Sequence, residues 1–317
     1  MLWFDNAIVP FILLGFYFAL NYLETRGVKW LLTSSLFFSI AALIKQTSIL
    51  FLIIFFVYLL FRKIPLKHIF LYCLIPILAV FPLLIRIFQE NSLEWFFQWT
   101  VLYPLLEWKK FPNYVQMSVN NNDLLVLQLL LVPPFIFTLF NLKIFKDKIF
   151  LLILLFLVSS LISIYPRFSY FHFQSALAIN IIFWTYISSK ISKKLVLLST
   201  SLLIFIFIPL IFKPTIIFSW DKETRFMSFQ DRELAAKIKK AVGVHKVFLL
   251  GLNSNLYALS GTLPPKPWVD NFGWYLEIPR VQEQVLLKWE EDPPYYIVWR
   301  KPSVGNWFDL GVYQPQK

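Results

Sequence analysis

A polar break divides a long apolar region of the chain at residues 42–49, Ala42-Leu43-Ile44-Lys45-Gln46-Thr47-Ser48-Ile49. Lys45 and Gln46 separate two runs, 30–44 and 49–61, that are otherwise almost wholly apolar. A lysine at the centre of a bilayer costs about 2.5–3.5 kcal/mol on insertion scales. We therefore predict a tight hairpin with Lys45 at a membrane surface. There it acts either as an ordinary snorkelling lysine or as a cation that meets an anionic lipid head group.

The composition is typical of an integral membrane protein. Hydrophobic residues make up 58% of the chain and aromatic residues 19%, which exceeds the apolar share of a soluble domain. Membrane proteins collect Lys and Arg in their cytoplasmic loops, so the net charge of +12 does not indicate a nucleic-acid partner. Cys73 is the single cysteine, and the three histidines come without a cysteine cluster. An intrachain disulfide is therefore excluded, and a structural zinc site is not expected.

The apolar segments predict a polytopic helical membrane protein with about eight spans. They cover roughly 7–23, 28–44, 47–61, 68–86, 124–142, 149–165, 170–188 and 195–212. Several approach the short limit for a span, which is common in bundles whose helices end in a protein-lined cavity. Residues 1–212 thus form the predicted transmembrane bundle, and residues 213–317 form a separate domain.

The distribution of Lys and Arg among the loops predicts the orientation. The connections after the first, third, fifth and seventh segments are basic, with Arg26, Lys29, Arg62, Lys63, Lys67, Lys143, Lys146, Lys148, Lys190, Lys193 and Lys194. The alternate connections are poor in basic residues for their length. We therefore expect the basic loops in the cytoplasm and the 213–317 domain on the opposite side of the membrane.

The external connection 87–123 has an amphipathic pattern. Its aromatic residues interleave with Glu94, Gln98 and Glu107, which predicts a helix lying in the membrane interface. Two interpretations remain open at this point. The segment either seals the outer surface of the bundle or forms a lid over a groove through which lipid enters.

The final segment, 213–317, reads as a small α/β domain with a partly parallel sheet. A helix begins near Ser228 and ends at Gly243, a strand covers 246–250, and a short helix over 253–260 closes at Gly261. Pro279 is the predicted first residue of another helix, and 295–299 is the second strand. No phosphate-binding glycine loop follows the first strand, so the domain is interpreted as an accessory to acceptor recognition.

A few polar residues on the predicted outer face are the candidates for chemistry. They are Asp5, Asn6, Lys45, Gln46, Arg86, Arg167, Tyr170 and His172. The cations suit a lipid phosphate, and a carboxylate suits an acceptor proton or a divalent metal ion. Three of them also have an ordinary structural interpretation. Asp5 starts a helix, Arg167 anchors at lipid head groups, and His172, one turn into the seventh span, is a hydrogen-bonded interior histidine.

Several stretches, in this order, resemble the GT-C superfamily of polytopic membrane glycosyltransferases, the relatives of protein mannosyltransferases and aminoarabinose transferases. They are Phe4-Asp5-Asn6-Ala7, Gly15-Phe16-Tyr17-Phe18-Ala19-Leu20, Ala41-Ala42-Leu43-Ile44-Lys45-Gln46-Thr47, Pro166-Arg167-Phe168-Ser169-Tyr170-Phe171-His172, Leu256-Tyr257-Ala258-Leu259-Ser260-Gly261 and Asp292-Pro293-Pro294-Tyr295-Tyr296-Ile297-Val298. The resemblance covers nearly the whole chain through loose motifs.

The resemblance implies inverting transfer of a sugar from a polyprenyl-phosphate donor to an extracytoplasmic glycan, lipid or protein acceptor. Asp5 matches an acid near the donor phosphate or a metal ion, while Lys45 and Arg167 match cations near the lipid phosphate. Such enzymes carry their main catalytic aspartate in an earlier external loop. The chain is therefore expected to be an N-terminally truncated member that is inactive alone or completed by another subunit.

Two other classes of function stay open on the sequence. A polymerase or ligase of lipid-linked glycans shares the compartment and the lipid substrate, and it would depend on Arg86 and the 87–123 connection. A transporter or flippase-like subunit would need polar groups deep within its spans, and the third, sixth and eighth segments are nearly featureless there.

Overall fold

The computed structural model describes residues 4–110, 128, 131–132, 135–136, 138–139, 142–165, 172–190, 201, 228–265, 276 and 278–301. The chain divides into two compact units. Unit 1 comprises Met1–Thr100 with Gln116–Thr215, and unit 2 comprises Val101–Val115 with Ile216–Lys317. The predicted domain boundary at 212–213 lies outside the described residues and stays a prediction.

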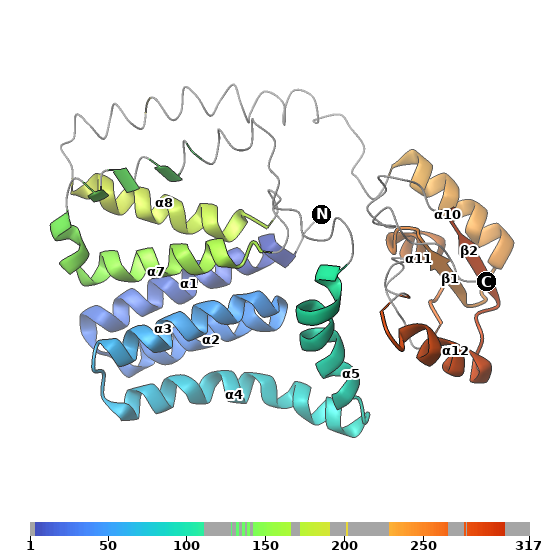
Figure 1. Ribbon diagram of the computed structural model, residues 1–317, viewed down its shortest axis with the longest axis horizontal. Coiled ribbons are helices and arrows are strands. Elements are labelled where there is room, and N and C mark those ends of the chain that lie inside the picture. The colour runs from blue at the N-terminus through green and yellow to red at the C-terminus, as the bar shows by residue number, and fades with distance from the viewer. Residues whose placement is uncertain are drawn as a thin grey trace. The chain divides into compact units, whose positions relative to one another are not determined.

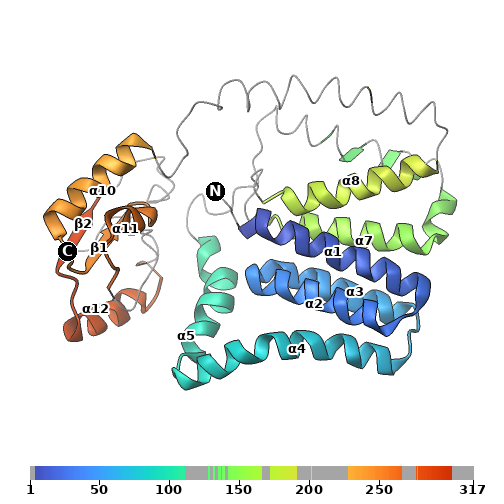
Figure 2. The same ribbon diagram turned by 180° about the vertical axis from the view of Figure 1, so that it is seen from behind.

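Unit 1 is built from helices that lie side by side, and each helix runs opposite to the one before it from α1 to α4 and again from α7 to α8 (Figures 1 and 2). They are α1 (Phe4–Thr25), α2 (Val28–Ile44), η1 (Gln46–Ser48), α3 (Ile49–Phe61), α4 (Leu66–Gln89), η4 (Leu142–Lys146), α7 (Lys148–Ile162) and α8 (Gln174–Ser189). Because the helices alternate in direction, the described connections fall at two ends. We call one the Lys45 end; it contains the α2–α3 junction and the turn before α8. We call the other the basic end; it contains residues 26–29, 62–67, 142–148 and 190.

The core of unit 1 is aromatic, as expected from the number of phenylalanines. Phe156 of α7 lies at its centre, with ring centroids 5.2 Å from Phe16 of α1, 5.4 Å from Phe38 of α2 and 5.6 Å from Phe51 of α3. All four side chains are at most 2% exposed. Rings at these separations gain dispersion and quadrupole interactions beyond simple burial, so α7 is packed against the first three helices although it is remote in sequence.

Serine hydroxyls supply polar cross-links between the helices of unit 1. Ser34 of α2 donates to the Gly15 carbonyl of α1 at 2.8 Å, and Ser35 donates to the Tyr72 carbonyl of α4 at 2.7 Å. The Tyr72 hydroxyl in turn donates to the Leu52 carbonyl of α3 at 3.0 Å. These buried bonds join four helices, which is how small hydroxyl residues stabilise helix packing without a charged group.

The fold is mostly helical with a small sheet, as predicted. Helices with described bounds lie in the predicted segments 7–23, 28–44, 47–61, 68–86, 149–165 and 170–188. Among the described residues, two helices are long and apolar enough to cross a membrane, Ala7–Thr25 and Leu66–Gln89. The apolar helices Val28–Ile44, Gln46–Phe61 and Lys148–Ile162 are shorter. The segments 124–142 and 195–212 lie largely outside the described residues, so the number of spans stays a prediction.

The start of the predicted interfacial segment 87–123 is helical, but its geometry is irregular. The chain forms α5 (Leu93–Phe97), a π-helix η2 (Gln98–Glu107) that contains Pro104, and a short 3₁₀ turn η3 (Trp108–Lys110). Proline has no N–H to donate within a helix, which is consistent with the wider helical turn around it. Residues 111–123 lie outside the described part of the chain.

Unit 2 contains a parallel pair of strands with helices around it. Its described elements are α10 (Phe229–Val242), β1 (Val247–Leu250), α11 (Asn255–Ser260), α12 (Val281–Glu291) and β2 (Tyr296–Trp299). β1 pairs with β2 in parallel, with Val247 opposite Tyr296 and Leu250 opposite Trp299. β1 is largely buried, and the Leu249 N–H donates to the Tyr257 hydroxyl of α11 at 2.9 Å. The parallel pairing predicted from the order of elements is confirmed.

The helix ends of unit 2 follow local sequence signals at three of four predicted positions. Ser228 and Asp231 form a reciprocal capping box at the start of α10. Gly243 (φ 65°) and Gly261 (φ 67°) close α10 and α11 in the left-handed region. The predicted start of the last helix at Pro279 is wrong, because Arg280 adopts a left-handed conformation (φ 69°) and α12 begins at Val281.

Candidate functional site

The polar break at residues 45–48 is a sharp turn that presents the Lys45 side chain at a helix end. α2 ends at Ile44, and Lys45 has an extended backbone (φ −145°, ψ 116°). Its N–H donates to the Ala41 carbonyl at 2.9 Å, and its carbonyl accepts from the Ser48 N–H at 2.9 Å. The backbone polar groups are thus satisfied within the turn, while the half-buried Lys45 side chain lies at the end of unit 1.

The structure brings Lys45 together with His172, which lies 127 residues further along the chain. The Lys45 Nζ is 3.4 Å from the His172 Nδ1. An ammonium group can only donate, so Nδ1 accepts and the proton of the neutral ring lies on Nε2. Both side chains are half-buried. Two of the residues singled out from the sequence therefore form one polar pair.

His172 does not lie within a helix as predicted. It occupies a turn, and α8 begins two residues later at Gln174. The apolar run from Tyr170 made the segment look like a continuous span. A turn position leaves the imidazole at the end of unit 1, next to the end of α2, rather than along the side of a helix.

Ser48 lies beside this pair in the chain and was not singled out from the sequence. Its side chain is 1% exposed, and its Oγ has no hydrogen-bond partner among the described residues. A buried hydroxyl with an unused donor carries a desolvation cost, which is unusual away from a functional site. The sequence signal was weak because serine is common at helix starts.

Gln46 and Arg86 do not join the pair through any described contact. The Gln46 side chain is exposed in η1. Arg86 lies in the last turn of α4 rather than at its end, because the helix continues to Gln89. Its Nε donates to Glu90 at 2.9 Å, and the Arg86 side chain is 77% exposed. An exposed i,i+4 ion pair of this kind contributes little free energy.

The remaining predicted residues are placed only in part. Asp5 and Asn6 belong to the first turn of α1, and their side chains lie outside the described residues. Because α1 and α2 are antiparallel neighbours, that turn lies at the same end as Lys45 (Figure 1). Arg167 and Tyr170 also lie outside the described part of the chain. Their predicted roles stay predictions.

Among the side chains that the structure describes, no group of three or more His, Cys, Asp or Glu residues gathers as a metal site would require. The His172 imidazole lies beside the Lys45 ammonium group. A metal ion bound to this imidazole would be electrostatically unfavourable, because it would lie next to another positive charge. The prediction of a divalent metal ion therefore rests on Asp5 alone.

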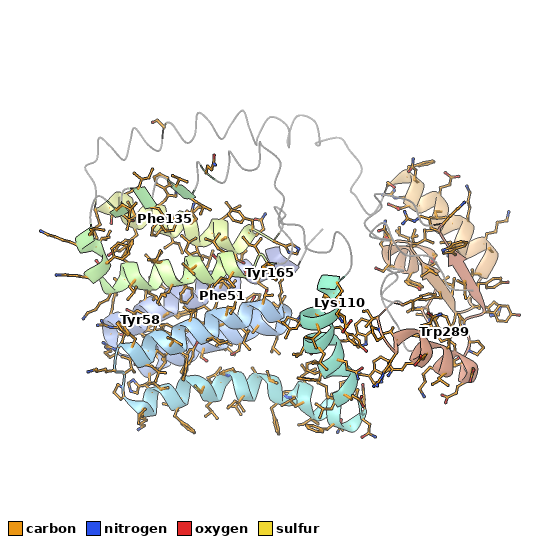
Figure 3. The ribbon with its side chains drawn as sticks, viewed as in Figure 1. Phe51, Tyr58, Lys110, Phe135, Tyr165 and Trp289 are labelled. Atoms are coloured by element: carbon orange, nitrogen blue, oxygen red, sulfur yellow. The ribbon has the colours of Figure 1, made fainter. Side chains whose placement is uncertain are left out.

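The structure places an ammonium group and an imidazole together at the Lys45 end, and both types of group can donate hydrogen bonds to an anion. Figure 3 shows Tyr165, the last described residue before this turn, and Tyr58 at opposite ends of unit 1, with Phe51 between them. The polar pair is thus separated from the basic end by the aromatic core.

No known protein family matches the chain, and comparisons with characterised proteins and with solved structures give no significant match.

Proposed function

We propose that the chain is a polytopic membrane protein that transfers a sugar from a polyprenyl-phosphate donor to an extracytoplasmic acceptor. The observation that carries the proposal is the contact between Lys45 and His172. Both residues occur in the stretches that resemble GT-C glycosyltransferases. The contact joins the first and third of the external turns expected from the loop charges, which supports a shared pocket.

Exposed apolar side chains along unit 1 support its placement in a bilayer. On α4 the side chains of Phe70, Ile77 and Phe81 are 66%, 62% and 55% exposed. On α3 the side chains of Ile53 and Val57 are 47% and 49% exposed. A soluble monomer rarely leaves such contiguous apolar faces in water, whereas lipid chains solvate them at no cost. Basic loops at one end then favour the bacterial inner membrane with that end in the cytoplasm.

The proposed role of the pair is to hold the phosphate of the donor lipid. The Lys45 ammonium and the His172 Nε2–H donate to phosphate oxygens, and the positive charge of Lys45 stabilises the leaving polyprenyl phosphate. In the transfer step an acceptor oxygen attacks the anomeric carbon while the bond from that carbon to the phosphate oxygen breaks. The acceptor proton passes to a carboxylate, for which Asp5 is the proposed base or metal ligand.

The other candidate residues and the 213–317 region are proposed to assist the same sugar transfer. Arg167 adds a second cation at the phosphate, and Asn6 and Tyr170 complete the polar wall of the pocket. The 213–317 region contributes to acceptor recognition outside the membrane.

The first test is binding of polyprenyl phosphate to the purified full-length protein in neutral detergent. We expect Lys45→Met to weaken binding about 10- to 100-fold, because a charge-assisted hydrogen bond contributes about 1.5–3 kcal/mol. Lys45→Arg should retain most of the affinity. His172→Gln should weaken binding by a smaller factor, because it removes a neutral donor.

Arg86→Met is the matched control, because it removes an exposed cation of the same end that is paired with Glu90. Unchanged binding in Arg86→Met together with loss in Lys45→Met supports the proposal. The reverse result would favour a polymerase or ligase of lipid-linked glycans. Sugar transfer is then measured with polyprenyl-phosphate mannose and polyprenyl-phosphate aminoarabinose, and an Asp5→Asn variant that transfers either sugar normally would refute the assigned base.

A further inference from the structure

Polar contacts join the connections at the basic end of unit 1 into one surface. The Tyr22 hydroxyl, near the end of α1, hydrogen-bonds with the His68 Nδ1 at the start of α4 at 2.8 Å. The Tyr58 hydroxyl, near the end of α3, donates to the Lys148 carbonyl at the start of α7 at 2.9 Å. α1 and α4 are thereby joined at this end, and so are α3 and α7.

A third contact adds α8 to this surface. The Asp147 carboxylate caps α7 by accepting from the Ile149 N–H at 2.9 Å, and it also accepts from the Tyr186 hydroxyl of α8. The hydrogen bonds of Tyr22, Tyr58 and Tyr186 thus join the helix ends next to the basic connections at one end of unit 1.

The cations of the basic end greatly outnumber its carboxylates. Asp147 pairs with Lys190 at 3.7 Å, and the exposed Glu24 forms no ion pair with any described residue. The remaining cations have no carboxylate partner among the described residues; they are Arg26, Lys29, Arg62, Lys63, Lys67, Lys143, Lys146 and Lys148. Like charges gathered without counter-charges repel one another, so an external anion stabilises this surface.

Two of these cations occupy backbone positions at which glycine is the relaxed residue. Arg26 follows α1 with φ 57°, and Lys63 follows α3 with φ 52°. A side chain in the left-handed region costs free energy that glycine avoids. The helix macrodipole favours a cation at a helix end, but an ordinary right-handed position in the last turn would satisfy it without strain. The strain at Arg26 and Lys63 is consistent with cations that are retained at these positions for their charge.

Exposed apolar side chains lie beside the cations in the chain. Phe61 is 70% exposed and Leu66 79% exposed around the Arg62–Lys63 turn, and Leu142 and Phe145 are 65% and 42% exposed within η4. Alternation of exposed apolar and cationic residues is the pattern of segments at the boundary between acyl chains and head groups.

We infer that the basic end of unit 1 is a binding surface for the anionic head groups of bilayer phospholipids, with Arg26 and Lys63 as contact residues. The apolar neighbours enter the acyl region while the cations meet the lipid phosphates. The inference rests on the membrane placement proposed above and is independent of sugar transfer. The proposed surface lies at the end of unit 1 opposite to Lys45, and the phospholipid that it binds is not a substrate of a reaction.

The experiment measures stabilisation of the full chain by lipid. The protein is purified in neutral detergent, and its thermal unfolding is followed while phosphatidylglycerol or phosphatidylcholine is titrated into the micelles. We expect phosphatidylglycerol alone to raise the Tm. Arg26→Asn and Lys63→Asn should each shift the half-saturating phosphatidylglycerol fraction upward by about fivefold, and the double variant by about 25-fold. Asparagine tolerates the left-handed region, so these variants keep the fold.

Arg280→Asn is the matched control, because it makes the same substitution at φ 69° in unit 2. It should leave the phosphatidylglycerol titration unchanged, as should Lys63→Arg. Unchanged titration in the double variant, equal stabilisation by phosphatidylcholine, or equal stabilisation by inorganic phosphate would each overturn the inference. Lys45→Met separates the two proposals, because it should retain the phosphatidylglycerol response even where polyprenyl phosphate binding is lost.

Discussion

The charged residues of unit 1 that the structure describes lie at or near the ends of its helices, and their partners determine what each can do. Lys45 donates to His172 at one end, 3.4 Å from the imidazole Nδ1. At the other end, the Asp147 carboxylate has a structural role, because it accepts hydrogen bonds from the start of α7 and from Tyr186. Arg86 is bound to Glu90 in an exposed pair. Charge alone therefore does not identify a site, because a partner within the protein can satisfy it.

Asp147 gives a prediction about pH dependence at the residue scale. Burial acts to raise its pKa, but the hydrogen bond from Tyr186, the bonds from the Phe150 and Ile149 N–H groups and the charge of Lys190 together lower the pKa below its ordinary value. A carboxyl whose pKa is depressed by folding contributes stability above its unfolded pKa of about 3.9 and loses it as pH falls through the folded value.

We therefore expect Asp147→Asn to lower stability by about 1 kcal/mol at pH 7, and the difference from the wild type to shrink as the pH falls below about 4. Asp147→Ala should cost about 2 kcal/mol at pH 7, because it also removes the helix cap and the acceptor of the Tyr186 hydroxyl. Thermal unfolding of the purified protein between pH 3 and pH 8 measures both. A difference that is constant across this range would contradict the assignment.

At the scale of the elements, the hairpin of α1 and α2 depends on one close approach. A Cβ added at Gly15 would lie 2.4 Å from the Phe38 Cε1, and the Gly15 carbonyl accepts from Ser34 at the same crossing. The absence of a side chain at Gly15 thus lets the Phe38 ring reach Phe156 and Phe55 in the core. Small residues at helix crossings have this role in membrane bundles.

Gly15→Ala is expected to destabilise the protein by about 1–3 kcal/mol, because the added methyl group displaces a fully buried ring. The double variant Gly15→Ala with Phe38→Leu should be less destabilised than the sum of the single variants, since a smaller side chain makes room for the methyl group. Thermal unfolding of the four proteins gives the coupling. If the stability changes of the two single variants simply add in the double variant, the close approach of Gly15 and Phe38 is not what limits the packing.

At the scale of the whole molecule, the alternation of helix direction separates two chemically different ends of unit 1. The basic end carries cations that mostly have no carboxylate partner among the described residues, while the Lys45 end carries the polar pair and the acids of the α4–α5 region. If unit 1 spans a membrane, the two ends face different compartments, and the excess of Lys and Arg assigns the basic end to the cytoplasm.

Cysteine labelling tests this arrangement, because Cys73 is the single native cysteine. In a Cys73→Ala background we expect Glu90→Cys to react with a membrane-impermeant maleimide in intact cells. Lys29→Cys should react only after the membrane is permeabilised. Both side chains are exposed in the structure, so burial does not explain a difference. The background protein without cysteine is the control, and labelling of both positions from the same side would refute the alternating topology.

Local sequence signals by themselves determined most of the element positions. The break at Lys45 ended α2, the Ser228–Asp231 capping box began α10, and the left-handed glycines closed α10 and α11. The order of helices and strands also predicted the parallel pairing of β1 with β2. These features depend on interactions over a few residues or on connection length, which is why the sequence alone was sufficient.

Only the tertiary structure decided which side chains meet. The Lys45–His172 contact spans 127 residues, and the partner of Arg86 depended on how far α4 extends. The close approach at Gly15 and the joining of the basic end by Tyr22, Tyr58 and Asp147 follow from the rotation of each helix about its axis. Apolar residues surround these helices on most sides, so hydrophobic periodicity does not specify that rotation, and only side-chain packing between helices resolves it.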